Sequence, residues 1–129
     1  MYTHIEGNIY SIFVPLPENP LKNLNAYFIM GEGGRNLLID TGFRRDECRE
    51  ALLEGIAELG ASMEDTDICL THLHSDHTGL AAELAAPGAK IYISREDGTR
   101  LEQFRQASNS HRMDEYSRLG FSEAEIAFL

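Results

Sequence analysis

An α/β layered fold is predicted by three observations along the sequence. Short apolar stretches rich in β-branched and aromatic residues recur between residues 9 and 93, and several are separated by segments with helical spacing of apolar residues. Segments containing glycine and proline lie at the boundaries. Strands that alternate with helices are typical of a sheet covered by helices. The 129 residues, 43% hydrophobic and 25% charged, suit one globular domain without repeats.

Five strands are expected, each bounded by a recognisable turn or breaker. They are residues 9–14, 25–30, 36–40, 67–71 and 90–93. Pro15, Pro17 and Pro20 enforce a loop after the first strand, because proline has no backbone N–H to donate to a sheet. The Gly-Glu-Gly-Gly sequence at 31–34 predicts a hairpin turn, because glycine tolerates positive φ angles.

Three helices are expected between and after these strands. Residues 46–59 form the most regular pattern, and Gly60 is a typical helix end. Their apolar stripe consists of Cys48, Leu52, Ile56 and Leu59. Residues 80–86 predict a short alanine-rich helix, and Ser94 followed by acidic residues predicts the start of another that runs toward Phe104.

The most informative stretch holds three of the five histidines and an aspartate within six residues: His72, His74, Asp76 and His77. In an extended segment His72 and His74 point to the same side, and a bend brings Asp76 and His77 toward the same volume. Imidazole and carboxylate groups that converge in this way are divalent metal ligands. A surface His pair followed by a helix cap is the alternative, but the preceding apolar strand favours the metal site.

Asp40 closes an apolar strand and has two possible roles. It is either a turn-forming aspartate or a group that holds the metal-site loop or a ligand imidazole by a hydrogen bond. The remaining histidines, His4 and His111, lie in contexts typical of structural or exposed residues. Cys48 and Cys69 are expected to fill the core as free thiols.

The net charge of −10 argues against a nucleic-acid or anionic-membrane surface. The sequence contains no apolar run near the ~20 residues of a membrane span and no charged-then-apolar leader. A cytoplasmic protein is therefore expected.

The sequence resembles the metallo-β-lactamase superfamily, in particular its glyoxalase II-like metal-dependent hydrolases. The resemblance rests on His72-x-His74-x-Asp76-His77, on Asp40-Thr41-Gly42 and on the early strand at 23–29, and it extends to about Ile93. It implies the N-terminal half of an αββα sandwich, with a mixed sheet and flanking helices. The resemblance also favours Asp40 as the group that holds the metal-site loop or a ligand imidazole, over a turn-forming aspartate.

The resemblance further implies a site for two metal ions. His72 and His74 would belong to one and Asp76 and His77 to the other, whereas the positions of later family ligands would fall beyond Leu129. Zinc is expected, with iron or manganese as alternatives. In a complete protein of this type, a metal-bound hydroxide would attack a small-molecule substrate that is an ester, thioester, lactam or phosphodiester, and Asp76 would orient that nucleophile as the catalytic residue.

Ser122-Glu123-Ala124-Glu125 is a capping box, which predicts a helix that begins shortly before the last residue. Residues 1–129 are therefore expected to be a single partial domain, truncated at its C-terminus and weakly active or inactive alone. Its uncovered sheet face is expected to mediate homo-oligomer formation. The alternative function is a non-catalytic metal-binding or interaction module with the same fold. An amidohydrolase is disfavoured, because that class needs a barrel of ~250 residues.

Overall fold

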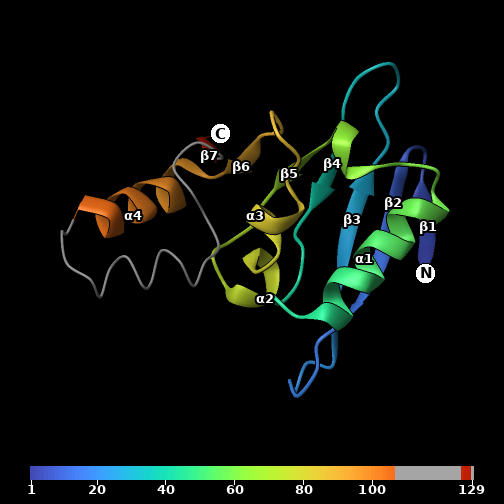
Figure 1. Cartoon of the computed structure of the whole chain (residues 1–129), viewed down its shortest axis with the longest axis horizontal. Coiled ribbons are helices and arrows are strands. Elements are labelled where there is room, and N and C mark those ends of the chain that lie inside the picture. The colour runs from blue at the N-terminus through green and yellow to red at the C-terminus, as the bar shows by residue number, and fades with distance from the viewer. Residues whose placement is uncertain (107–125, 129) are drawn as a thin grey trace.

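The computed structural model describes residues 1–106 and 126–128, which form a mixed sheet with helices (Figure 1). The strands are β1 (Tyr2–Glu6), β2 (Ile9–Pro15), β3 (Asn23–Ile29), β4 (Asn36–Ile39), β5 (Thr66–Cys69), β6 (Ile91–Ile93) and β7 (Ile126–Phe128). The helices are α1 (Asp46–Glu58), the 3₁₀ turn η1 (Met63–Asp65), α2 (Ser75–Thr78), α3 (Ala81–Leu84) and α4 (Arg95–Gln106).

The strands lie in the sheet in the order in which they occur along the chain. Neighbours from β1 to β4 are antiparallel, and neighbours from β4 to β7 are parallel. Because β4 and β5 run in the same direction, their carboxyl ends meet at one edge of the sheet. Ile39 pairs with Cys69 there, and the next residue, Asp40, donates its backbone N–H to the Cys69 carbonyl at 2.9 Å.

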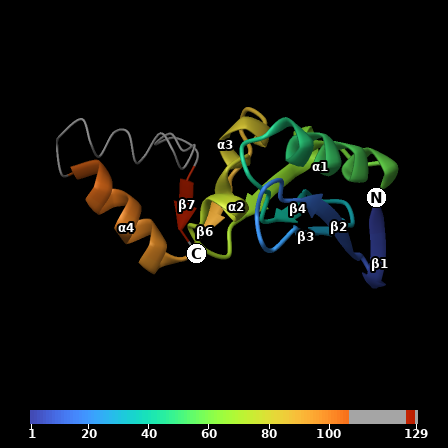
Figure 2. The same ribbon diagram turned by 90° about the horizontal axis from the view of Figure 1, so that it is seen from below.

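Helix α1 covers one face of the antiparallel part of the sheet. Ile12 and Val14 of β2 are fully buried beneath it, together with Leu52 of the helix. The backbones approach closely at Gly55, where an added Cβ would lie 2.7 Å from Cγ2 of Ile12. Figure 2 shows α1 and α3 on the same side of the sheet.

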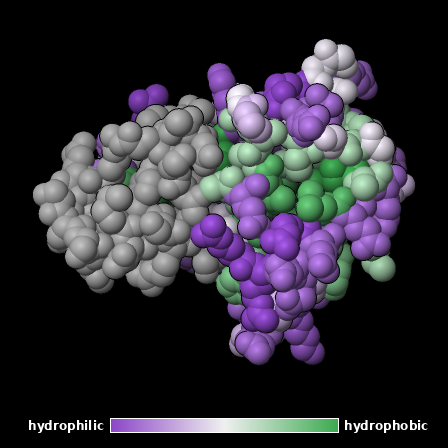
Figure 3. Space-filling model, in the orientation of Figure 1, coloured by the Kyte–Doolittle hydropathy of each residue, from purple (hydrophilic) through white to green (hydrophobic). Residues whose placement is uncertain are grey.

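The opposite face of the antiparallel strands carries no helix within the described residues. Phe13 and Tyr27 project from it with 43% and 40% of their surface exposed, and Ile9 of β2 is 36% exposed. Figure 3 draws the other side of the molecule, on which α1 lies in Figure 1, and hydrophobic residues gather there toward the middle of the coloured part with hydrophilic ones around them. No described helix is long and apolar enough to cross a membrane.

The five strands and three helices predicted from the sequence are present, with ends that differ by one or two residues. β1, η1 and α2 were not predicted. The helix expected to begin at Ser122 was wrong for the described residues that follow it, because Ile126–Phe128 form β7 parallel to β6. Pairing with the edge of β6 satisfies the backbone there, so tertiary context overrides the local capping signal. Residues 122–125 themselves lie outside the described part.

Candidate metal centre

The metal motif begins where β5 ends and finishes in the first turn of α2. Leu70 is buried and donates its N–H to the Tyr92 carbonyl of β6 at 2.9 Å, which anchors the start of the loop. The loop carries His72 and His74, and α2 carries Asp76 and His77. All four positions therefore lie at the carboxyl edge of the parallel strands, where α/β proteins place their sites.

Three of the predicted ligands form one cluster. His72, Asp76 and His77 each offer one ligand atom, and these atoms all lie within 4.8 Å of one another. Nε2 of His77 is 3.5 Å from Oδ2 of Asp76, and the rings of His72 and His77 have centroids 4.1 Å apart. The three residues are only partly buried, so the cluster is open to a ligand from solvent.

His74 lies beside this cluster, and its ring nitrogens are not part of it. Its ring is exposed and packs edge-on against His72, with centroids 4.6 Å apart. Its carbonyl accepts the N–H groups of His77 and Thr78 at 2.9 and 3.0 Å, which closes the turn of α2. The structure thus groups His72 with Asp76 and His77, unlike the pairing of His72 with His74 that the family resemblance implies.

Asp40 forms hydrogen bonds with both groups named in the second of its two expected roles, the loop after β5 and an imidazole. Its Oδ1 accepts the Thr71 N–H at 2.9 Å, and its Oδ2 accepts the Thr71 hydroxyl at 2.7 Å and lies 3.0 Å from Nδ1 of His77. The residue is 6% exposed and has a φ of 64°, a left-handed conformation that aspartate tolerates better than most residues. Its part in metal binding stays a prediction.

Thr41, which the sequence analysis named only as part of the Asp40-Thr41-Gly42 element, ties this strand end to α2. Its N–H and its hydroxyl both donate to the His77 carbonyl, at 2.8 and 2.7 Å, and the residue is fully buried. The Leu80 N–H donates in turn to the Thr41 hydroxyl at 3.3 Å. The available signal in the sequence was its place between Asp40 and Gly42, directly after an apolar strand.

The donor set fits a divalent cation. Two imidazoles and a carboxylate are the ligand types that zinc and similar metals take. Because Nδ1 of His77 is engaged by Asp40, Nε2 is the nitrogen that faces Asp76. A carboxylate bound to the far nitrogen of an imidazole is the usual support of a metal-ligating histidine.

Neither of the two cysteines belongs to this cluster. Burial, and to a lesser degree the negative charge of Asp40, raises the pKa of the Cys69 thiol. Burial is also the main cause that raises the pKa of Cys48, whose thiol lies 3.0 Å from the Pro15 carbonyl as a hydrogen-bond donor. Both are free thiols, as predicted.

His4 lies on β1, with Nε2 at 2.8 Å from the Gly7 carbonyl, and it is exposed as expected. His111 lies outside the described residues.

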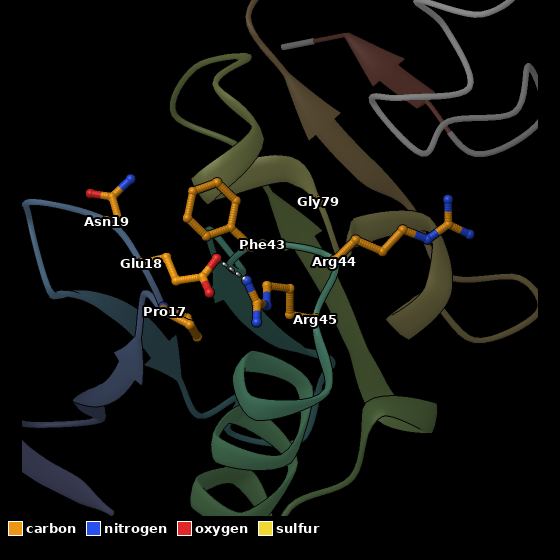
Figure 4. A pocket seen from close by; sticks show the side chains of 7 residues that line it. All are labelled: Pro17, Glu18, Asn19, Phe43, Arg44, Arg45 and Gly79. Carbon is orange, nitrogen blue, oxygen red and sulfur yellow. Dashed lines mark hydrogen bonds and ion pairs between the residues drawn. The ribbon is translucent and has the colours of Figure 1, made fainter.

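A pocket of about 360 Å³ lies between the β2–β3 loop, the β4–α1 loop and Gly79, the residue after α2, and none of the cluster residues lines it (Figure 4). It is lined by Pro17, Glu18, Asn19, Phe43, Arg44, Arg45 and Gly79. In Figure 4 the side chains of Glu18, Phe43 and Arg45 lie near one another, whereas Arg44 extends the other way. Glu18 and Arg45 form an exposed ion pair at 3.5 Å. The size lies within the usual ~300–1,000 Å³ of small-molecule sites.

Comparison with known proteins decides the family. Residues 20–122 match the model of the metallo-beta-lactamase superfamily. The chain belongs to this superfamily. The sequence-based identification is therefore confirmed, and so is the N-terminal part of the metallo-β-lactamase fold as the fold class.

Curated relatives of this superfamily member include fungal thioesterases. An atrochrysone carboxyl ACP thioesterase of Aspergillus fumigatus is 40% identical over 68 residues, which cover 53% of this chain and 15% of that protein. An enzyme of the same name from Pseudocercospora fijiensis is 32% identical over 78 residues, covering 59% and 23%. The chain thus matches less than a quarter of the length of these relatives.

Solved structures show the same partial coverage. A metallo-beta-lactamase family protein from Thermus thermophilus is 32% identical with a TM-score of 0.68, covering 82% of this chain and 35% of that one. The class B3 di-zinc metallo-beta-lactamase LRA-12 from an Alaskan soil metagenome is 27% identical with a TM-score of 0.61, covering 78% and 35%. A beta-lactamase domain protein from Burkholderia ambifaria, 18% identical with a TM-score of 0.72 and covering 99% and 44%, shows the fold alone.

Proposed function

We propose that this chain provides the metal-binding part of a metal-dependent hydrolase that cleaves an ester, thioester or lactam. The observation that carries the proposal is the cluster of His72, Asp76 and His77, with Asp40 holding the far nitrogen of His77. The names of the relatives, thioesterases and β-lactamases, support a carbonyl centre as the point of attack. A phosphodiester, which the sequence left open, has no such support.

The residues of this site divide into ligands and supports. His72 and His77 would bind the cation through neutral imidazoles, and Asp76 through its carboxylate. His74, whose ring packs against His72 beside the cluster, stays a predicted ligand. A divalent cation held by these residues would supply Lewis acidity, which favours attack of water on a carbonyl. Asp76 would also orient the attacking water and accept its proton, and its carboxylate lies in the same cluster, 3.5 Å from Nε2 of His77. Zinc is proposed, and the name of the relative LRA-12 describes that protein as di-zinc.

Elemental analysis after incubation with zinc and extensive dialysis tests the metal site. We expect wild-type chain to retain zinc and the variants His72→Ala and His77→Ala to lose most of it. His4→Ala is the matched control, because His4 is exposed on β1 and takes no part in the cluster. A wild-type chain that retains no zinc, or variants that retain as much as the wild type, contradict the proposal.

Turnover separates the hydrolase from a metal-binding module of the same fold. Release of free thiol from a small acyl thioester, and ring opening of a lactam, are to be followed with the zinc-loaded protein. Hydrolysis that disappears in His77→Ala supports the hydrolase. Zinc binding without hydrolysis of an ester, a thioester or a lactam is expected both of the non-catalytic module and of a hydrolase part that is inactive alone, so hydrolysis by the zinc-loaded protein is the outcome that decides between them.

A further inference from the structure

Thr71 lies between Asp40 and His72 and touches both. Its hydroxyl oxygen is 2.7 Å from Oδ2 of Asp40 and 2.8 Å from Nδ1 of His72. Its backbone N–H donates to the other carboxylate oxygen, Oδ1, at 2.9 Å. The threonine is therefore held on the carboxylate at two points while its hydroxyl also reaches the imidazole.

Counting protons fixes the direction of these hydrogen bonds. A hydroxyl carries one hydrogen, and an ionised carboxylate only accepts, so the Thr71 hydrogen points to Asp40. The hydroxyl oxygen is then an acceptor toward His72, and Nδ1 of His72 must be the protonated nitrogen. The reverse arrangement would place two oxygens without a hydrogen between them 2.7 Å apart.

The same argument applies directly to His77. Its Nδ1 lies 3.0 Å from Oδ2 of Asp40, which accepts, so this nitrogen also carries the hydrogen. Both imidazoles then have a lone pair on Nε2, and this tautomer binds a metal through that nitrogen. The buried carboxylate of Asp40 therefore sets the tautomers of two rings. It acts on His77 by direct contact and on His72 through the Thr71 hydroxyl.

We propose that Thr71 is a positioning residue that transmits the hydrogen-bonding of Asp40 to His72 and so fixes the Nδ1–H tautomer of that histidine. The role requires a hydroxyl at this position and no particular size. Serine keeps the function, whereas valine has the shape of threonine without the donor and acceptor. The consequence for metal affinity rests on the proposed function, but the tautomer itself does not.

Long-range ¹H–¹⁵N NMR of the histidine rings tests the proposal on the metal-free chain. At about pH 8, where an ordinary imidazole of pKa ~6.5 is neutral, wild type is expected to show Nδ1–H for both His72 and His77. Thr71→Val is expected to lose this preference at His72 and keep it at His77. Thr71→Ser is expected to restore it. An unchanged His72 spectrum in Thr71→Val, or a serine variant that behaves like valine, overturns the proposal.

Zinc affinity, measured by competition with a chelator, gives the second readout. Thr71→Val is expected to bind zinc about tenfold more weakly, which is the low end for lost support of a metal ligand, and Thr71→Ser to stay close to wild type. Thr99→Val is the matched control, because the Thr99 hydroxyl donates to the Arg95 carbonyl within α4, away from the cluster. Equal affinity of Thr71→Val and wild type overturns the inference. If wild type binds no zinc, the proposed function fails, and the tautomers alone decide the role of Thr71.

Discussion

Asp40 combines a buried carboxylate, a left-handed backbone and three hydrogen-bonding contacts in one residue. A buried carboxylate is costly unless its oxygens accept hydrogen bonds, and here both oxygens are used. The partners come from the loop after β5 and from α2. The residue thus joins two segments that are more than 30 positions away in the sequence.

Replacing Asp40 by asparagine tests this arrangement. The amide keeps the shape but presents N–H groups to Nδ1 of His77 and to the Thr71 hydroxyl, so one imidazole loses its acceptor. We expect the free energy of unfolding to fall by about 1–3 kcal/mol without metal, and zinc affinity to fall at least about tenfold. Urea unfolding and chelator competition measure the two effects.

Asp65→Asn is the control for this substitution, because Asp65 is exposed in η1. It should change the free energy of unfolding by less than about 0.5 kcal/mol. A variant at Asp40 that is as stable as this control and binds zinc like wild type would show that the three hydrogen bonds have no bearing on either property.

The two thiols give the chain a dependence on alkaline pH. In the folded protein, burial raises the pKa of Cys48 and Cys69 above the ordinary value of 9.0, so the unfolded chain loses these protons first as pH rises. The resulting stability is present below pH 9 and is lost above it. Unfolding midpoints in urea should decline from about pH 9 upward, and less so in a Cys48→Ala/Cys69→Ala variant. An identical decline in both proteins contradicts the assignment to the thiols.

Among the structural elements, α1 depends on close contact with β2. At Gly55 an added Cβ would lie 2.7 Å from Cγ2 of Ile12, a branched side chain that is fully buried and has no space to move aside. In an exposed helix, glycine to alanine would stabilise by about 1 kcal/mol. Here the overpacking cost of about 1–3 kcal/mol exceeds that gain, so Gly55→Ala should lower the free energy of unfolding.

Chemical unfolding of Gly55→Ala beside Glu54→Ala measures this difference. Glu54 is exposed on the same helix and should change stability by less than about 0.5 kcal/mol. A stabilised Gly55→Ala variant would mean that the helix shifts freely over the sheet.

Helices and strands whose apolar residues recur with a clear period were predictable from the sequence. Elements without such a period were not. The apolar stripe of α1 and the buried residues of β2 carry clear periodicities. β1 is exposed along its whole length, so no alternation marks it, and β7 forms through pairing with β6 against its own capping signal. The ligands in the metal motif were recognisable because they are adjacent in the chain. The contacts of Thr41 and Thr71 depend on the register of β4 and β5, which no local pattern contains.

At the scale of the molecule, the helix-free face of the antiparallel strands is an apolar surface without a cover among the described residues. Phe13 and Tyr27 are both about two-fifths exposed there. Exposed apolar patches on soluble proteins are frequent interaction sites. Self-association of this chain through that face, expected from the sequence, stays a prediction.

Light scattering at micromolar concentrations checks this prediction. Wild-type chain should show a mass above that of one 14.5 kDa protomer, and Phe13→Ser/Tyr27→Ser should shift the population toward the monomer. The control is Leu53→Ser, because Leu53 is 41% exposed on α1, on the other side of the sheet. A wild-type protein that is monomeric throughout this range is incompatible with the prediction.

The contacts of Asp40 with Thr71 and His77 form only when β4 and β5 pair in the observed register, with Ile39 opposite Cys69. A slip of one residue between β4 and β5 would move Asp40 by ~3.3 Å along Thr71 and turn its side chain to the opposite face. Misaligned sheets therefore lack the support that orients the two imidazoles. A cation that binds only the supported arrangement stabilises the correct alignment in proportion to the logarithm of its concentration. The concentration of metal ions during synthesis would then influence which register of β4 and β5 the chain retains. This effect would be separate from any part of the metal in catalysis.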